Sequence, residues 1–267
     1  MAQLPGPAAL VHEWFTPRSV GGAELVVQQL DVLLERPQLA ALVDGESARA
    51  ASWLAGRSIQ TSFVQHLPWG VSHVQQYLPL LPLAIEQLDL AAYPLVISSS
   101  HLVAKGVLTS PDQCHLSYVH TPVRYAWDQM HAYLRQSALA RRGLSPLIRW
   151  QLHRLRQWDV ISAQRPDALM ANSRFTAARI RRYWGRSSTV VHPPVAVERL
   201  ILAEQGLGSG VLLHGRPEAR TFLRDRMAQV APEGAGRKFY ITRSGQPARR
   251  GMIVGEASLE ALFAAEG

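Results

Sequence analysis

Short apolar segments alternate with segments of helical periodicity along the first 195 residues of this 267-residue chain. This alternation is typical of repeated β-α units, whose strands lie parallel to one another in a single sheet. We expect strands at residues 8–11, 39–43, 59–64, 96–98, 116–119, 168–171 and 189–191. The sequence therefore predicts an α/β fold built on a doubly wound parallel sheet.

The helices between these strands are predicted from periodicity and from residues that start or stop helices. A helix that opens at Gly21-Gly22 has one apolar face, formed by Val26, Leu30, Leu33 and Leu34. Ser173 and Gly185 are suitable N-cap and C′ residues for a helix over 175–184. Further helices are expected over residues 71–90 with proline interruptions, 125–139 and 146–163.

One predicted strand stops abruptly at polar residues, in the segment HLSYVHTPVRYAW at 115–127. Pro122 cannot donate a hydrogen bond to a sheet and restricts Thr121 to extended geometry, so the strand should end near His120. A helix should then begin around Arg124. Ligands of open α/β sheets bind outside the carboxyl ends of the strands, which makes His120 a candidate for anion or hydroxyl chemistry. The alternative is a capping or packing role.

Two other strand ends carry groups suited to the same edge of the sheet. Gly21 and Gly22 open a helix directly after a strand, where backbone N–H groups and the helix dipole attract an anion. Alternatively, the pair only forms a tight turn. Ser99 and His101 follow the predicted strand at 96–98. The simpler interpretation is that they cap the next helix, and the alternative is that they hold a sugar hydroxyl.

The chain carries a formal net charge of +8 and a sequence pI near 10.2. This charge implies attraction to phosphates, in nucleotides, anionic lipids or nucleic acid. Lys105 and Lys238 are the only lysines, so 28 basic residues less 2 leaves 26 arginines. The predicted helix at 146–163 combines arginines with Trp150 and Trp158, which fits an anionic membrane surface; a solvated arginine face is the alternative. Nucleic acid is not expected as a partner, because no recognised reader motif accompanies the charge.

The single cysteine, Cys114, excludes an intrachain disulfide and a cysteine-rich zinc site, and it suits a reducing compartment. The amino-terminal residues have no basic segment followed by a long apolar one, so no secretory signal is expected. The most apolar window, residues 77–90, is too short and too interrupted by proline and acidic residues to span a bilayer. We therefore expect a cytoplasmic protein, or one held at the inner face of the membrane.

Four blocks of the sequence carry a more specific pattern in their order and spacing. They are VHEWFTPRSVGGAE at 11–24, VISSSHLVAKGV at 96–107, HTPVRYAWD at 120–128, and ANSRFTAARIRRYWG followed by VVHPPV at 171–195. Together they resemble the amino-terminal, acceptor-side domain of glycosyltransferase family 4 enzymes that act on bacterial surface polysaccharides. The resemblance implies that residues 1–195 form a Rossmann-like domain, the amino-terminal half of a GT-B fold.

The same resemblance implies a reaction and a set of site residues. A hexose would move, with retention, from a nucleotide-sugar co-substrate to a polysaccharide or lipid-linked acceptor, without a metal or other cofactor. His120 would be the catalytic residue at the sugar-transfer site. The residues expected to bind substrate or phosphate are Gly21, Gly22, Ser99, His101, Thr121, Arg124, Asn172 and Ser173.

Residues 196–267 do not continue this pattern. The resembled enzymes carry, in a second donor-binding domain, two glutamates with seven residues between them, and no two glutamates of this chain have that spacing. RKFYITRSGQPARRGMIVGE at 237–256 instead resembles an internal segment of glycosyltransferase family 61, with Arg243 and Arg250 at its basic positions. We expect a linker and a short α+β tail. A separate partner chain supplying the donor domain would complete an enzyme; the alternative is a non-catalytic fused or truncated remnant that binds an acceptor or a partner chain.

Overall fold

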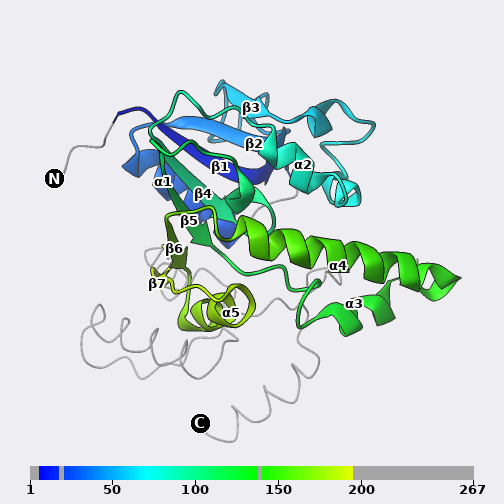
Figure 1. Ribbon diagram of the computed structural model, residues 1–267. Helices are drawn as coiled ribbons and strands as arrows, with labels where there is room; N and C mark the ends of the chain where they lie inside the picture. The colour runs from blue at the N-terminus through cyan, green and yellow to red at the C-terminus, as the bar shows by residue number, and fades with distance from the viewer. Residues whose placement is uncertain (1–5, 18–20, 138–139, 195–267) are drawn as a thin grey trace, which may run out of the picture. The chain divides into compact units, whose positions relative to one another are not determined.

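A computed structural model of the chain describes residues 6–17, 21–137 and 140–194. Within these residues seven parallel strands form one sheet in the order β3-β2-β1-β4-β5-β6-β7 (Figure 1). The strands are β1 (Ala8–Phe15), β2 (Gln38–Asp44), β3 (Ile59–Thr61), β4 (Leu95–Ser100), β5 (Cys114–Val119), β6 (Ala168–Ala171) and β7 (Thr189–Val190). The order runs outward from β1 in both directions, which confirms the predicted doubly wound α/β fold.

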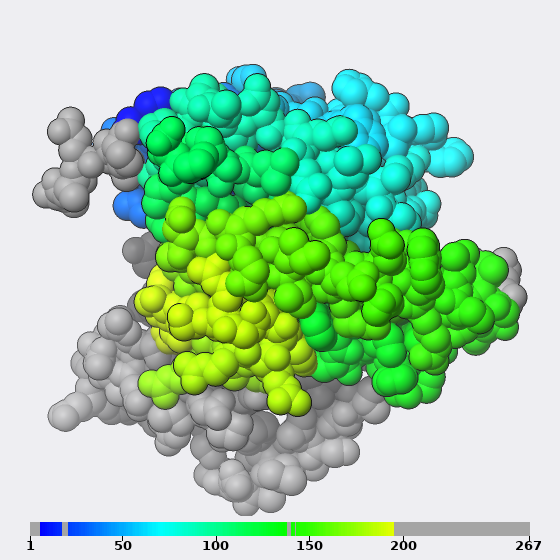
Figure 2. All heavy atoms as spheres, in the orientation of Figure 1, coloured from blue at the N-terminus to red at the C-terminus, as the bar shows by residue number. Residues whose placement is uncertain are grey.

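The helices of the described residues connect these strands. The α-helices are α1 (Gly22–Leu33), α2 (Leu81–Glu86), α3 (Met130–Gln136), α4 (Ser145–Ser162) and α5 (Arg174–Trp184). The 3₁₀ turns are η1 (Phe63–His66), η2 (Val74–Tyr77) and η3 (Ala104–Gly106), and a π-helical turn, η4 (Ala140–Leu144), leads directly into α4. The first half of α4 and the neighbouring α3 project from the side of the sheet (Figures 1 and 2).

The two faces of the sheet bury separate apolar cores. Alternate residues of a strand point to opposite faces, so Val11 of β1 packs in one core and Leu10 in the other. Helices α2 and α4 cover the first face, where Leu152 and Leu155 of α4 are almost completely buried. Helix α1 covers the second face through Val27. This three-layer arrangement leaves the carboxyl ends of the strands along one edge of the sheet.

Two strands extend further than their apolar residues indicate. β1 continues to Phe15 and buries His12 and Glu13, whereas the predicted strand stopped at residue 11. β4 continues to Ser100, so Ser99 lies inside the strand and the prediction that it caps a helix is wrong. Both predictions ended the strand at its first polar residues, but these polar groups are buried because they hydrogen-bond to each other across the sheet.

Several helix predictions also need correction. The helix expected from Arg124 begins only at Met130, because the residues between them form irregular turns. Residues 71–90 contain only η2 and α2 instead of a mainly helical segment, and the third predicted strand ends at Thr61. On α1, Leu33 is 71% exposed, so the predicted apolar face is wrong at that position. The α5 prediction is confirmed: Ser173 caps its start and Gly185, in left-handed conformation, ends it.

Candidate functional site

The candidate site lies where the strand order reverses, between β1 and β4. In doubly wound sheets this switch point leaves a crevice outside the carboxyl ends of the strands, where ligands bind. His12 and Glu13 lie in the second half of β1, Ser99 lies near the end of β4, and His120 directly follows β5. His101 lies in the turn that follows β4. The fold thus brings together residues separated by more than 100 positions in the sequence.

Glu13 is the centre of this group and is completely buried. Its Oε1 accepts hydrogen bonds from four consecutive backbone N–H groups, those of residues 101–104, at 2.8, 2.8, 3.1 and 3.1 Å. The Ser100 hydroxyl donates a fifth hydrogen bond to the same oxygen at 3.1 Å. The turn after β4 therefore closes around a carboxylate from β1. Glu13 accepts hydrogen bonds from the backbone N–H groups of this turn, a capping role that the sequence suggested for serine.

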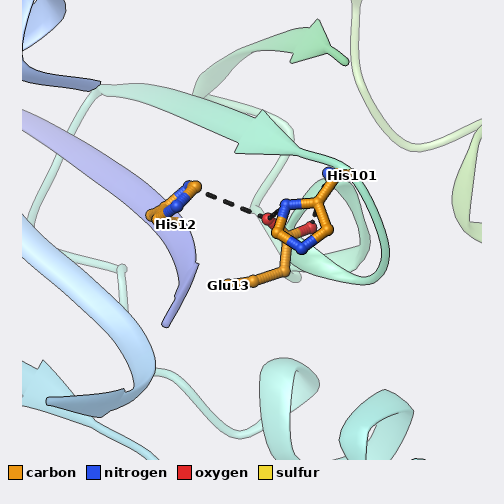
Figure 3. A group of neighbouring side chains, drawn as sticks. All are labelled: His12, Glu13 and His101. Atoms are coloured by element: carbon orange, nitrogen blue, oxygen red, sulfur yellow. Dashed lines mark hydrogen bonds and ion pairs between the residues drawn. The ribbon is translucent and has the colours of Figure 1, made fainter. Parts of the chain in front are cut away.

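His101 forms an ion pair with Glu13, with 3.0 Å between its Nδ1 and the carboxylate Oε2 (Figure 3). Burial lowers the pKa of His101, but the charge of Glu13, its hydrogen bond and the charge of Glu24 together outweigh burial, so the net pKa is raised above the ordinary value. Burial alone would raise the pKa of Glu13, yet His101 and the hydrogen bonds from the turn bring it below its ordinary value. A carboxylate and an imidazolium are the forms that this pair favours. The His101 side chain is 29% exposed, so its charge reaches the edge of the sheet.

His12 takes the opposite charge state. Its Nδ1 donates a hydrogen bond to the backbone oxygen of Ser99 at 3.0 Å and lies 3.7 Å from Oε2 of Glu13. Burial lowers the pKa of His12 despite the nearby carboxylate, which favours the neutral ring. Within the described part of the chain, Nε2 of His12 is buried and has no hydrogen-bond partner. The neutral ring therefore presents a free lone pair inside the site.

His120 is also neutral. Burial, followed by the nearby His12, lowers the pKa of His120 to about 3. Its Nε2 is 2.8 Å from the hydroxyl of Ser99, which is itself completely buried. The His120 backbone oxygen accepts hydrogen bonds from Nδ2 of Asn172 at 3.0 Å and from Oγ1 of Thr176 at 3.3 Å. Its ring and its backbone are thus held from β4 and from the start of α5.

Four other predicted site residues, Asn172, Ser173, Thr121 and Arg124, differ in their contacts and exposure. Asn172 holds the His120 backbone, and Ser173 caps α5 by accepting from the Thr176 N–H while its hydroxyl contacts Oδ1 of Asn172 at 3.0 Å. Thr121 donates its hydroxyl to the Pro122 backbone oxygen at 2.9 Å. Arg124 is exposed, and its charge lowers the pKa of His101 without outweighing Glu13. The substrate-binding roles of these residues stay predictions.

Gly21 and Gly22 lie at the exposed start of α1, after β1 and on the same edge of the sheet as the histidines. The Gly21 backbone is extended, a conformation that residues with side chains also adopt. A Cβ on Gly22 would meet nothing within 4 Å, and one on Gly21 would meet only the end of the Glu24 side chain at 3.2 Å. Packing among the described residues therefore does not require glycine here, and the predicted role of the pair in binding phosphate stays a prediction. The Glu24 charge also raises the pKa of His101, so the turn and the ring are electrostatically coupled.

His12, Glu13 and His101 place one ligand atom each within 4.8 Å of one another, a spacing that a metal ion can bridge. Some of these donors are already engaged, however. Oε1 of Glu13 accepts five hydrogen bonds, and Oε2 of Glu13 forms an ion pair with Nδ1 of His101. Within the described residues, Nε2 of His12 has neither a hydrogen bond nor an ion pair. Metal binding needs deprotonated ligands, so an ion would have to displace the His101 proton. The group fits an ion pair better than a metal centre.

Sequence reasoning did not select His12 or Glu13 as site residues. Both lie in VHEW, ahead of the glycine pair, and a carboxylate in a buried strand is itself an indication of function. The hydrogen-bond donors to this carboxylate lie 87 to 91 positions away, so no local pattern could identify them.

Comparison with known proteins adds no family assignment. No protein-family model matches the sequence, and no curated protein matches it. Among the described residues, no helix has both the length and the apolar character needed to cross a membrane.

Proposed function

We propose that the protein is a glycosyltransferase that moves a hexose from a nucleotide-sugar donor onto a polysaccharide or lipid-linked acceptor. The observation that carries this proposal is the group of three imidazoles at the switch point of the sheet, one charged and two neutral. An open glycine turn lies at the same edge. These features suit a diphosphate and a sugar, and they occupy the sequence blocks that resemble family 4 glycosyltransferases.

The positive groups of the site have a defined task in such a reaction. A leaving nucleoside diphosphate gains negative charge as its bond to the sugar breaks, and fixed positive groups stabilise that charge. The His101 imidazolium and the N–H groups at the start of α1 would supply this stabilisation, with exposed Arg124 adding a further charge. Glu13 supports the arrangement by keeping His101 protonated.

The neutral His120 ring has a different task. A neutral imidazole both donates and accepts a hydrogen bond, and Ser99 occupies only Nε2. Nδ1 would therefore bond a sugar hydroxyl or a phosphate oxygen. Asn172 fixes the backbone of His120, and Thr121 and Ser173 lie beside it in the sequence or the structure. No metal and no cofactor beyond the nucleotide sugar takes part in this proposal.

The direct test is turnover of a panel of UDP- and GDP-hexoses with a lipid-linked acceptor. The assay is run with and without a cell extract of the source, which would supply any further component that turnover needs. We expect His120→Ala to lower turnover about 100-fold to 1,000-fold, the range for losing one preorganised group. Exposed His66 is a matched control, and His66→Ala should leave turnover unchanged.

One observation favours a second candidate function. The glutamate pair that the resembled enzymes use for the donor is missing from the whole sequence. A remnant without catalysis would still bind an acceptor or a partner chain at the same edge. Calorimetry separates the two cases: no nucleotide binding and no turnover across the panel, with or without extract, would favour the non-catalytic protein.

A further inference from the structure

The projecting α3–α4 region has an unusual charge pattern. Residues 129–158 contain six arginines and not one aspartate or glutamate. Of these arginines, Arg156 is used internally, since its NH1 donates to the Ala126 backbone oxygen at 2.8 Å. Arg135, Arg141, Arg149 and Arg154 are exposed. This region therefore carries positive charge and no acidic side chain of its own.

The same region exposes large apolar side chains. Leu144, Leu147 and Trp150 are 44%, 59% and 56% exposed, although residues of this kind are usually buried. Their spacing of three residues places Leu147 and Trp150 on one side of α4, away from the buried Leu152, and Leu144 precedes them in the turn that leads into the helix. Arg154 lies beside them, with its guanidinium carbon 5.9 Å from the centre of the Trp150 ring. We call Leu147, Trp150 and Arg154 the α4 outer face.

The combination selects one class of partner. Nucleic acid would account for the arginines but not for a stripe of leucine and tryptophan, and a purely apolar protein groove would not account for the arginines. An anionic lipid surface takes both, because arginine meets the headgroups while tryptophan and leucine enter the boundary with the acyl chains. The outer face also belongs to the part of α4 that projects from the sheet (Figure 1).

We propose that the α4 outer face docks the protein on the surface of an anionic lipid bilayer. The helix lies in the plane of the surface and does not cross it. The proposal rests on the surface alone and holds whether or not the protein is a transferase. If it is one, docking brings the edge of its sheet to a lipid-linked acceptor.

Sedimentation with lipid vesicles tests the proposal on the full chain. We expect binding to vesicles that contain phosphatidylglycerol, weak binding to phosphatidylcholine alone, and release at high salt. Each arginine near an anionic surface strengthens partitioning about fivefold, so Arg154→Gln should weaken it about fivefold. Leu147→Ser with Trp150→Ser should weaken it as well, whereas Trp69→Ser, at an exposed tryptophan elsewhere, should not. Circular dichroism checks that all variants are folded.

Three results would overturn the proposal. The first is equal binding to the two kinds of vesicle, or binding to neither. The second is loss of binding in the arginine variant only, with the Leu147 and Trp150 variant unchanged. The third is that the chain binds duplex DNA more tightly than the anionic vesicles at the same salt, which would assign the charge to nucleic acid.

Discussion

Replacing Glu13 by glutamine tests the centre of the site, because it removes the negative charge and keeps the shape. Oε1 of Glu13 accepts five hydrogen bonds, and Oε2 pairs with His101 at 3.0 Å. A hydrogen bond to a charged acceptor contributes about 1 kcal/mol more than one to a neutral acceptor, but bonds to a shared atom do not add fully. We expect Glu13→Gln to lower the free energy of unfolding by about 3–5 kcal/mol, the range for breaking a buried ion pair.

Urea denaturation measures this change, with exposed Glu35→Gln as the matched control, for which we expect less than about 0.5 kcal/mol. Histidine NMR titration gives a second measurement. In Glu13→Gln the pKa of His101 should fall below its ordinary value, since burial would then act without the opposing carboxylate. A loss of stability below about 1 kcal/mol together with an unchanged His101 titration would refute the conclusion that Glu13 holds both the turn and the charge.

Two further predictions concern buried titratable side chains. Lowering the pH from 6.5 toward 4 should destabilise the fold, because burial lowers the pKa of His115 to about 4 and that of His120 to about 3, so the unfolded chain binds more protons in this window. His115→Asn should flatten the dependence of urea stability on pH. Lys105 pairs with buried Asp159 at 2.7 Å, and Lys105→Met should cost about 3–5 kcal/mol because it leaves that carboxylate without its cation. Surface Arg49→Met, which also breaks an ion pair, should cost less than about 1 kcal/mol in the same denaturation experiment.

The parts of the fold that follow from local chemistry could be predicted. Helix α5 is an example, since Ser173 accepts the N–H of Thr176 at its start and Gly185 takes a left-handed conformation at its end. The alternation of strands and helices predicted the class of the fold, which is a doubly wound parallel sheet. The start of α3 could not, because the turns after Arg124 depend on tertiary contacts such as the bond from Trp127 Nε1 to Asp159 at 2.8 Å.

The site could be predicted only in its position. Polar residues after apolar strands indicated one edge of the sheet, and His120 and Ser99 meet at that edge. The roles could not be assigned, because the backbone donors to the Glu13 carboxylate come from the turn after β4, and no pattern within β1 reveals them. A polar residue inside a strand was taken as the end of that strand, although long-range hydrogen bonds make its burial favourable.

Ser99 connects the two halves of the site through a single residue. Its backbone oxygen accepts from His12 and its hydroxyl contacts His120, so β4 carries both rings as one rigid unit. Both hydrogen bonds end on Ser99, so a ligand that moves Ser99 would disturb both rings. Two ligands bound on either side of β4 would therefore influence each other's affinity, and by thermodynamic linkage that influence is equal in both directions.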